Sequence, residues 1–243
     1  MKSDYLIEAQ DISMRFGGVH ALTKVNFTLE RKELRCLIGP NGAGKSTFFK
    51  ILSGQQKPSS GQLWYAGKAM VGRPTYEFAR MGMGIKNQLP SVLDGLSIQE
   101  NIYLALSTTH GSRKPQSAEC IWHLLEQVGL DKQRERLVGE LAHGQRQWIE
   151  IAMVLAGNPE LVLLDEPAAG MSDDETGRTA ELIRAMTEHA AVIVVEHDMA
   201  FIRSIAKKVT VFHQGHILME DSFDAVVRDV TVRNVYLGRS ASC

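Results

Sequence analysis

A glycine-rich stretch in the first quarter of the chain has the residue types and spacing of a phosphate-binding loop. Residues 39–47 read GPNGAGKST, which fits the pattern G-x-x-x-x-G-K-[ST]. The stretch follows a short apolar run and precedes a helical sequence, the strand-to-helix context that such a loop requires. Glycines let backbone N–H groups approach phosphate oxygens, and the helix N-terminus adds a positive dipole end. We therefore expect this loop to bind the phosphates of a nucleotide.

The side chains of this loop have separate expected roles. Lys45 would reach the β- and γ-phosphates, Ser46 would give a hydroxyl to Mg²⁺, and Thr47 would cap the helix or contact the α-phosphate. The alternative, an ordinary glycine-rich turn, is disfavoured by the strand-to-helix placement. The expected ATP-binding residues of the loop are Gly39, Asn41, Gly42, Gly44, Lys45, Ser46 and Thr47.

Two adjacent acids follow a second apolar run. The sequence LVLLDEP places Asp165 and Glu166 at the end of a buried strand, where the ligands of open α/β sheets bind. We expect Asp165 to belong to the Mg²⁺ shell and Glu166 to take the proton from a water attacking the γ-phosphate. Acids that simply end a strand in solvent are the alternative, and the phosphate loop favours the catalytic reading.

A histidine follows a third apolar run. VIVVEHD ends a strand and delivers His197, whose ring could bond the γ-phosphate and hold the attacking water. A surface histidine at a strand end is the alternative. Its position on the strand after the Asp-Glu strand favours the catalytic role.

These residues require a parallel sheet to bring them together. The runs 34–38, 161–164 and 191–195 are continuously apolar, as expected of parallel strands covered on both faces. Residues 25–30 alternate apolar and polar, which predicts an N-terminal antiparallel sheet. We therefore predict an α/β fold of one domain over 1–243: a P-loop NTPase core with a mostly parallel sheet and an antiparallel β-subdomain.

A helical insert is expected over about 76–157. Its last helix, predicted over 145–156, has apolar residues at helical spacing and ends at a Gly-Asn-Pro sequence. The sequence LAHGQRQWIE, at 141–150, announces this helix with a Gly-Gln turn. A hairpin over 209–219 and a polar tail follow the last apolar strand.

Composition limits the classes of partner. Lys and Arg total 27 and Asp and Glu total 28, so the net charge of −1 gives no bulk attraction to nucleic acid or to an anionic membrane. Cys36, Cys120 and Cys243 have no metal-ligand spacing, and we expect reduced thiols in a cytosolic protein. No apolar run approaches the roughly 18 residues of a membrane span, so we expect a soluble chain unless a partner holds it at a membrane.

Four motifs in this order resemble those of the ATP-binding subunit of ABC transporters: GPNGAGKST, LAHGQ, LLDEP and EHD, over nearly the whole chain. The resemblance implies a head-to-tail dimer in which each signature turn completes the partner's ATP site. A helix N-terminus and its backbone N–H groups would then face a γ-phosphate held by another subunit. The implied signature residues are Leu141, Ala142, His143, Gly144 and Gln145.

The same resemblance assigns two further residues. Gln88, in IKNQLPSV, would sense Mg²⁺ and the nucleophile and link the site to a transmembrane partner. Phe16, in MRFGG, stands where the family places an aromatic that stacks on adenine. A loop glutamine and a core phenylalanine are the alternatives.

The chain departs from the family pattern at two places. Ala142 and His143 replace the serine and first glycine of the common signature LSGGQ, so one hydroxyl contact to phosphate is lost. His143 could add a donor of its own, and two unequal ATP sites are expected if the partner has a fuller signature. Met171 stands where many members carry the aspartate of the loop joining the two sites.

Resemblance within the family points to an importer. LAHGQRQWIEIA, DEPAAGM and VYLG are similar to the ATPases of the branched-chain amino acid, amide and urea group, and residues 196–215 most resemble the urea-type member. The expected partners are a second, non-identical ATPase subunit, two separate permease subunits and, indirectly, an extracytoplasmic solute-binding protein, with the chain at the cytoplasmic face of the membrane. A soluble ABC-type switch and a weakly hydrolysing regulatory subunit are the alternatives.

Overall fold

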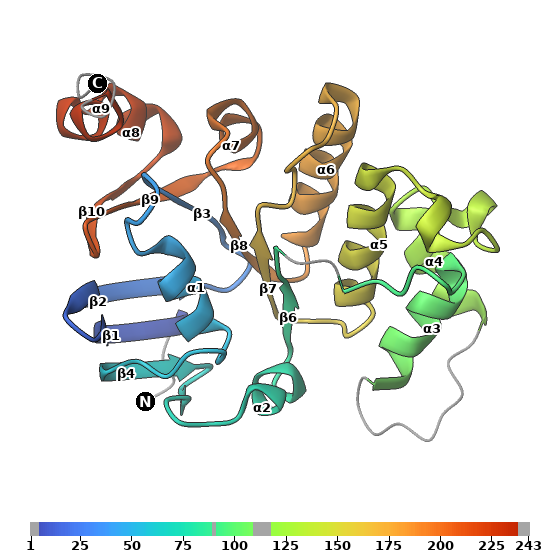
Figure 1. Cartoon of the computed structure of the whole chain (residues 1–243), viewed down its shortest axis with the longest axis horizontal. Coiled ribbons are helices and arrows are strands. Elements are labelled where there is room, and N and C mark those ends of the chain that lie inside the picture. Colours follow the sequence, from blue (N-terminus) through green and yellow to red (C-terminus); the bar gives the residue numbers. More distant parts are fainter. Residues whose placement is uncertain (1–4, 89–90, 109–117, 238–243) are drawn as a thin grey trace.

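Two sheets and a set of helices make up the fold of the computed structural model, which describes residues 5–88, 91–108 and 118–237 (Figure 1). The strands are β1 (Tyr5–Phe16), β2 (Val19–Glu30), β3 (Leu34–Ile38), β4 (Ser60–Tyr65), β5 (Lys68–Ala69), β6 (Met83–Lys86), β7 (Leu161–Asp165), β8 (Ala191–Val195), β9 (Lys208–His213) and β10 (His216–Asp221). The helices are α1 (Lys45–Leu52), α2 (Thr75–Arg80), α3 (Ile98–Thr108), α4 (Ala118–Gln127), α5 (His143–Leu155), α6 (Asp173–Met186), α7 (Met199–Ile205), α8 (Phe223–Arg228) and α9 (Val230–Leu237), with two 3₁₀ turns at Asp131–Gln133 and Val138–Glu140.

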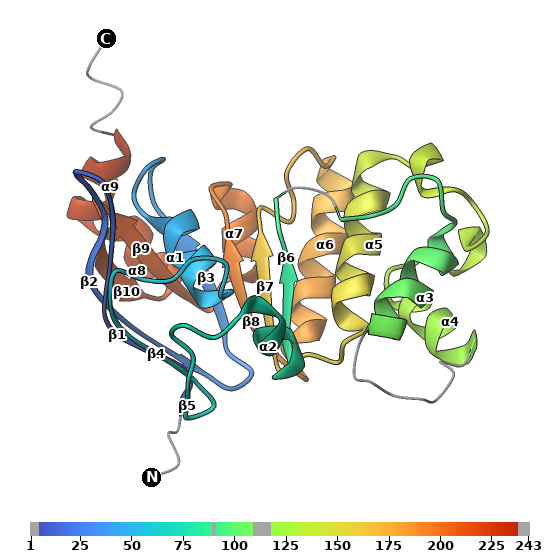
Figure 2. The same ribbon diagram turned by 60° about the horizontal axis from the view of Figure 1, so that its bottom comes forward.

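The N-terminal sheet is antiparallel, with strand order β2-β1-β4-β5. The alternation predicted over 25–30 is the end of the longer strand β2, in which Val25, Phe27 and Leu29 are buried and Asn26 is exposed. This alternation arises because successive side chains of a strand point to opposite faces. The buried face of the sheet covers α1, which lies between the two sheets (Figure 2).

The central sheet has the strand order β10-β9-β3-β8-β7-β6, and only β10 runs antiparallel to its neighbour. The runs predicted at 34–38, 161–164 and 191–195 form β3, β7 and β8, and every residue of β3 and β8 is buried. The predicted hairpin forms β9 and β10. The α/β fold expected from the sequence, with an antiparallel and a mostly parallel sheet, is confirmed.

Both faces of the central sheet are covered. Leu163 and Ile193 pack on one face with α1 and the antiparallel sheet. Val162 and Val194 pack on the other face with α6 and α7. These strands therefore read as continuous apolar runs, since neither face meets water.

Phe48 of α1 fixes the helix that follows the phosphate loop. Its ring lies 5.3 Å from Phe27 of the antiparallel sheet and 5.3 Å from Phe212 of β9, and all three rings are buried. Aromatic pairs at this spacing add about 0.5–1.5 kcal/mol beyond their buried area. One side chain of α1 thus ties the two sheets together.

The helical part is shorter than the sequence analysis predicted. Residues 76–157 include β6, which pairs with β7 in the central sheet, so the helices that enclose a separate core occupy 98–155. The last of them, α5, also packs against the central sheet through Ile151. β6 was missed because its sequence, MGIK, contains a glycine and a lysine and no apolar run. Helices α3, α4 and α5 enclose their own core around Ile102, Leu125 and Trp148, at the right of Figure 1.

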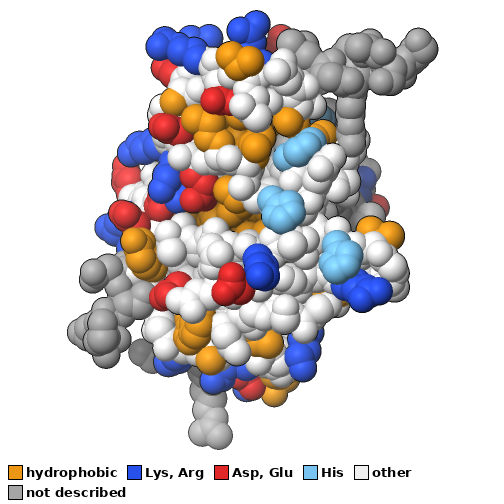
Figure 3. Space-filling model, turned by 90° about the vertical axis from the view of Figure 1, so that its left-hand side faces the viewer, with side chains coloured by type: hydrophobic (Ala, Val, Ile, Leu, Met, Phe, Trp, Pro, Cys, Tyr) orange, Lys and Arg blue, Asp and Glu red, His pale blue; other side chains and the backbone are white. Residues whose placement is uncertain are grey.

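Charges of both signs share the surface. Figure 3 shows the left-hand side of Figure 1, where blue and red side chains are interspersed and hydrophobic side chains form small groups among them. In the part of the chain that the structure describes, none of the helices has the length and apolar character needed to cross a membrane.

The contact between Gly39 and β9 is testable. A Cβ added at Gly39 would lie 2.2 Å from the carbonyl oxygen of Phe212, and its φ of +144° disfavours other residues. We expect Gly39→Ala to lower the free energy of unfolding by at least about 2 kcal/mol, measured by denaturant titration without nucleotide. Gly18→Ala is the control, because nothing lies within 4 Å of its added Cβ. Equal stability of the two variants would contradict this account.

Candidate functional site

The phosphate loop leaves β3 at Ile38 and enters α1 at Lys45. Gly44 is the N-cap of α1 with φ 109°, and a Cβ there would lie 2.8 Å from the carbonyl oxygen of Ala21. Gly42 also has a positive φ of 77°, but its Cβ position is open, so only its backbone conformation requires glycine. The loop is thus folded tightly between β9 and the antiparallel sheet.

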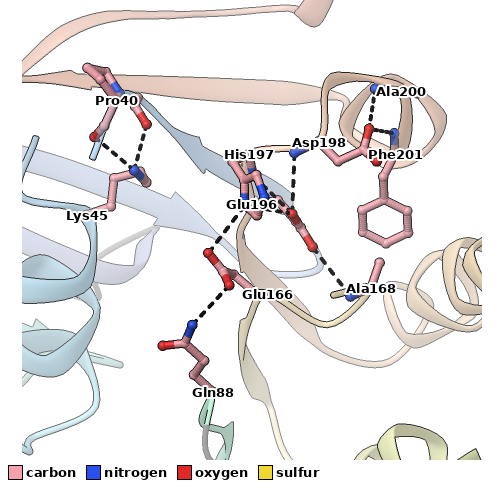
Figure 4. Close-up of polar contacts among 11 residues, drawn as sticks. Pro40, Lys45, Gln88, Glu166, Ala168, Glu196, His197, Asp198, Ala200 and Phe201 are labelled. Carbon is pink, nitrogen blue, oxygen red and sulfur yellow. Dashed lines mark hydrogen bonds and ion pairs between the residues drawn. The ribbon is translucent and has the colours of Figure 1, made fainter. Parts of the chain in front are cut away.

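Lys45 points back into the arc of this loop. Its Nζ donates to the carbonyl oxygens of Gly39 at 2.6 Å and Pro40 at 3.1 Å (Figure 4). The side chain is buried, whereas Asn41 and Ser46 are exposed and Thr47 is half-buried on the first turn of α1. The loop therefore presents a held ammonium group and free hydroxyls on one helix end.

Asp165 is the last residue of β7 and is half-buried. Burial and the neighbouring Glu166 carboxylate raise the pKa of Asp165, while Lys86 and Lys45 act in the opposite direction. Glu166 turns off the strand with φ 46°, a left-handed conformation that glutamate rarely adopts. Its N–H remains bound to the carbonyl oxygen of Val195 at 2.9 Å. The two carboxylates are therefore adjacent and electrostatically unfavourable without a cation.

Glu166 brings the predicted catalytic residues together. Gln88 Nε2 donates to Glu166 Oε2 at 3.1 Å, and His197 Nδ1 lies 3.3 Å from Glu166 Oε1 (Figure 4). Gln88 follows β6, Glu166 follows β7 and His197 follows β8, so three strand ends meet at one carboxylate. Their roles in catalysis remain predictions, and their proximity is a property of the fold.

Glu196 is a residue of the site that the sequence analysis did not single out. It is 2% exposed, and its carboxylate accepts hydrogen bonds from the backbone N–H groups of Ala168, His197 and Asp198. It thereby joins the loop after β7 to the loop after β8 (Figure 4). An acid directly after a fully apolar strand was the available signal.

The signature turn starts α5, which begins at His143, two residues before the predicted start. Leu141 is buried in the helical part, and the Gln145 side chain accepts from the N–H of Ala142 at 3.3 Å. The reciprocal half of a capping box is missing because Ala142 has no hydroxyl. The first turn of α5 therefore has backbone N–H groups that the methyl side chain of Ala142 cannot satisfy.

Two contacts join the signature turn to the residues after β7. His143 Nε2 lies 3.1 Å from the carbonyl oxygen of Ala169, within the chain. A Cβ on Gly144 would lie 2.3 Å from Glu175 Oε1, so a side chain there would displace the carboxylate that caps α6. Met171 turns its sulfur toward Thr179, whose hydroxyl also accepts from Trp148 of α5. The loop containing Met171 thus packs on the signature helix.

The signature turn and the phosphate loop of one chain are far apart in the fold. α1 and α5 lie on opposite sides of β7 and β8 in both ribbon views (Figures 1 and 2). Phe16, at the end of β1, is 50% exposed, as an aromatic that stacks on a ligand must be.

Comparison with known proteins identifies the family. The family model described as ABC transporter matches residues 22–169, more than half of the chain. The chain belongs to the ABC transporter family. It is an ATP-binding subunit of the α/β ABC cassette fold, with ATP hydrolysis as its activity.

Two relatives indicate where it stands in that family, and one solved structure has the same fold. The high-affinity branched-chain amino acid transport ATP-binding protein LivG of Escherichia coli K12 is 32% identical over 98% of this chain and 100% of its own. BraF of Pseudomonas aeruginosa, with the same described function, is 33% identical over 97% and 98%. The ADP conformation of MJ1267, an ATP-binding cassette of an ABC transporter, superposes with a TM-score of 0.88 at 24% identity, covering 97% of this chain and all of that one.

The structure describes two of the three cysteines. Cys36 is buried in β3 and Cys120 is exposed on α4, and neither forms a disulfide within the described residues. Burial raises the pKa of the Cys36 thiol, which makes it unreactive. Cys243 lies outside the described residues.

The charge on Asp165 is expected to oppose folding. Its folded-state pKa is raised, so the ionised carboxylate destabilises the ligand-free protein at neutral pH. We expect Asp165→Asn to melt about 2–4 °C above the parent at neutral pH without nucleotide. The gap should close as the pH falls through the raised pKa, because the parent then carries a neutral carboxyl.

Thermal melts over a pH series, followed by circular dichroism, measure this difference. Asp198→Asn is unsuitable as a control because Asp198 caps α7. Asp131→Asn serves instead, because Asp131 lies in a 3₁₀ turn that has no buried residue. A variant that melts no higher than the parent at neutral pH would contradict the electrostatic account.

Proposed function

We propose that this chain is the ATP-hydrolysing subunit of a multi-subunit ABC importer, in which ATP-driven closure of a head-to-tail dimer moves a separate permease. The main support for the proposal is that Gln88 and His197 both contact the carboxylate of Glu166, beside a phosphate loop. The position of the signature turn away from that loop supports a site completed by another subunit.

The acids at the end of β7 suit a divalent cation. Asp165 and Glu166 are adjacent carboxylates, and the raised pKa of Asp165 reflects burial and this unfavourable neighbour. Ser46 offers an exposed hydroxyl at the start of α1, and Gln88 offers a side-chain carbonyl. We assign Mg²⁺ to Ser46, Gln88 and Asp165, together with ATP. Bound there, the cation would neutralise phosphate charge and activate the terminal phosphoryl group.

The remaining side chains of the site have separate proposed roles in ATP binding and hydrolysis. Lys45, already directed into the loop, would pair with the β- and γ-phosphates. Glu166 would accept the proton of the attacking water, and Gln88 and His197 orient its carboxylate from both oxygens. The aromatic face of Phe16 is exposed for adenine to stack on.

The signature turn supplies the second half of a neighbour's site. The N-terminus of α5 has a partial positive charge and free N–H groups, which suit a γ-phosphate. Ala142 lacks the hydroxyl of the common motif, and the His143 ring is held by Ala169. Since this signature makes fewer contacts, we propose a heterodimer with a second ATP-binding subunit that has a fuller one.

A cavity of about 570 Å³ lies beside the segment that follows Gln88, and we infer that one face of a permease helix docks there. It lies between α2, β6, α3 and α5, and its lining includes the apolar side chains of Tyr76, Met83, Ala105 and Met153 and the charged side chain of Arg80. The cytoplasmic helix of a separate permease subunit is the proposed occupant, because Ser91, three residues after Gln88, also lines the cavity. Two such permease subunits would hold the chain at the cytoplasmic face of the membrane and receive solute from an extracytoplasmic binding protein.

The cargo belongs to a narrow group of small solutes. LivG and BraF are described as serving branched-chain amino acid transport, which favours those amino acids. Urea or a short amide is the second candidate, because residues 196–215 resemble the urea-type ATPase. No residue of this chain is expected to touch the cargo, so the choice rests on these resemblances alone.

Replacing the proposed base tests the mechanism. We expect Glu166→Gln to lower kcat for ATP by about 10²–10⁴-fold, because the amide cannot take a proton, while ATP still binds. Phosphate release and nucleotide affinity are measured on the same preparation. Glu160→Gln removes an exposed acid just before β7 and should leave kcat unchanged. Parental turnover by Glu166→Gln would remove Glu166 from the role of base.

The transporter assignment is tested by capture and uptake. The tagged chain is recovered from gently solubilised native membranes with ATP and vanadate, and its companions are identified by mass spectrometry. Two strongly hydrophobic chains and a second ATPase are the expected result, and recovery from the soluble fraction alone would refute the importer. Cells lacking the chain should lose uptake of labelled leucine, whereas loss of labelled urea uptake instead would favour the second candidate.

A further inference from the structure

A buried ion pair connects β6 to α5, and none of the steps above uses it. Lys86 Nζ lies 3.4 Å from Glu150 Oε2, and the side chains are 2% and 3% exposed. Burying two charges is costly, and such a pair is often no more stable than an apolar replacement. Its presence beside the catalytic segment therefore calls for a reason other than stability.

The same carboxylate holds the chain on the other side of Gln88. Glu150 Oε1 accepts a hydrogen bond of 2.7 Å from the backbone N–H of Ser91. Lys86 lies two residues before Gln88 and Ser91 lies three residues after it. One side chain of α5 thus binds both flanks of the glutamine that contacts Glu166.

Glu150 also lies on the helix that begins with the signature turn. It follows His143 by seven residues, about two helical turns along α5. A shift of α5 would therefore move the signature turn and the support of Gln88 together. The contact between His143 and Ala169 fixes the N-terminus of α5 to the loop after β7.

The charges of the pair reach the acids of the site. Burial lowers the pKa of Lys86, and Glu150 is the main group that opposes this change. Lys86 in turn acts on Asp165 by favouring its ionised form. Removing the charge of Glu150 would leave a buried cation next to the acids with its nearest counter-charge gone.

We propose that Lys86 and Glu150 are positioning residues for ATP hydrolysis, which hold Gln88 against Glu166 and link it to the signature helix. Neither side chain is expected to touch ATP. The proposal rests on the ATPase activity of the family, and its test measures ATP hydrolysis and does not depend on the cargo. Glu150 and Ser91 also line the cavity proposed above for a permease helix.

The test uses graded variants of the full chain, assayed with the companions that co-purify with it. Glu150→Gln keeps an acceptor for Ser91 but loses the charge facing Lys86. We expect it to lower kcat for Mg-ATP by about 10–100-fold, because a misplacement of about 1 Å in a catalytic group costs about 10²-fold. KM and ATP affinity should stay within about twofold, since the phosphate loop is untouched.

A double variant separates positioning from loss of stability. Lys86→Met with Glu150→Gln removes both charges and keeps the acceptor for Ser91, so kcat should recover to within about threefold of the parent. Lys86→Met with Glu150→Ala lacks that acceptor and should stay slow. This comparison remains informative even if Glu150→Gln alone does not fold.

The matched control is a second buried cation. Arg35 is 1% exposed and pairs with Glu220, on the opposite edge of the central sheet from β6. Glu220→Gln should lower the melting temperature and leave kcat unchanged, measured well below the melting transition. Parental kcat in Glu150→Gln would overturn the proposal. So would equal losses of kcat in Glu220→Gln and Glu150→Gln, or equal kcat in the two double variants.

Discussion

The parallel pairing of β3, β8, β7 and β6 determines where the reactive groups of this ATPase lie. Leu37 pairs with Val195, Val195 pairs with Asp165, and Leu164 pairs with Lys86, so the four strands end in one line. The phosphate loop, the histidine, the two acids and the glutamine each leave the sheet within a few residues of that line. A register slip of one residue would turn an alternate set of side chains to each face and separate these groups.

Charged side chains are concentrated at the carboxyl ends of these strands, more than folding alone requires. Asp165 and Glu166 lie at the end of β7 and Glu196 follows the adjacent strand β8, and the cations of Lys45 and Lys86 favour the ionised form of Asp165. In the ligand-free protein the balance is unfavourable for Asp165, whose pKa is raised. A phosphate group with a divalent cation suits such an edge, because it adds both signs of charge where the protein has arranged partners for each.

Much of the site could be predicted because its determinants are local in sequence. The phosphate loop, the acids after β7 and the histidine after β8 each follow an apolar run that forms a strand. β6 could not be predicted, since its pairing with β7 joins residues 83–86 to 161–164 and its own sequence is short and mixed. The pair of Lys86 and Glu150 was hidden for the same reason. The signature turn was found only through family resemblance, because its proposed ligand belongs to another subunit.

The left-handed backbone of Glu166 has a consequence for any attempt to redesign this protein. Asparagine or glycine would suit a φ of 46° better than glutamate does, so a search for sequences that best fit the backbone would replace the proposed base. The same search would favour an apolar pair in place of Lys86 and Glu150. Positions where a substitution raises the stability of the protein but lowers its activity therefore mark residues kept for their chemistry. Measuring both stability and activity for all single substitutions would identify these residues without a bound nucleotide.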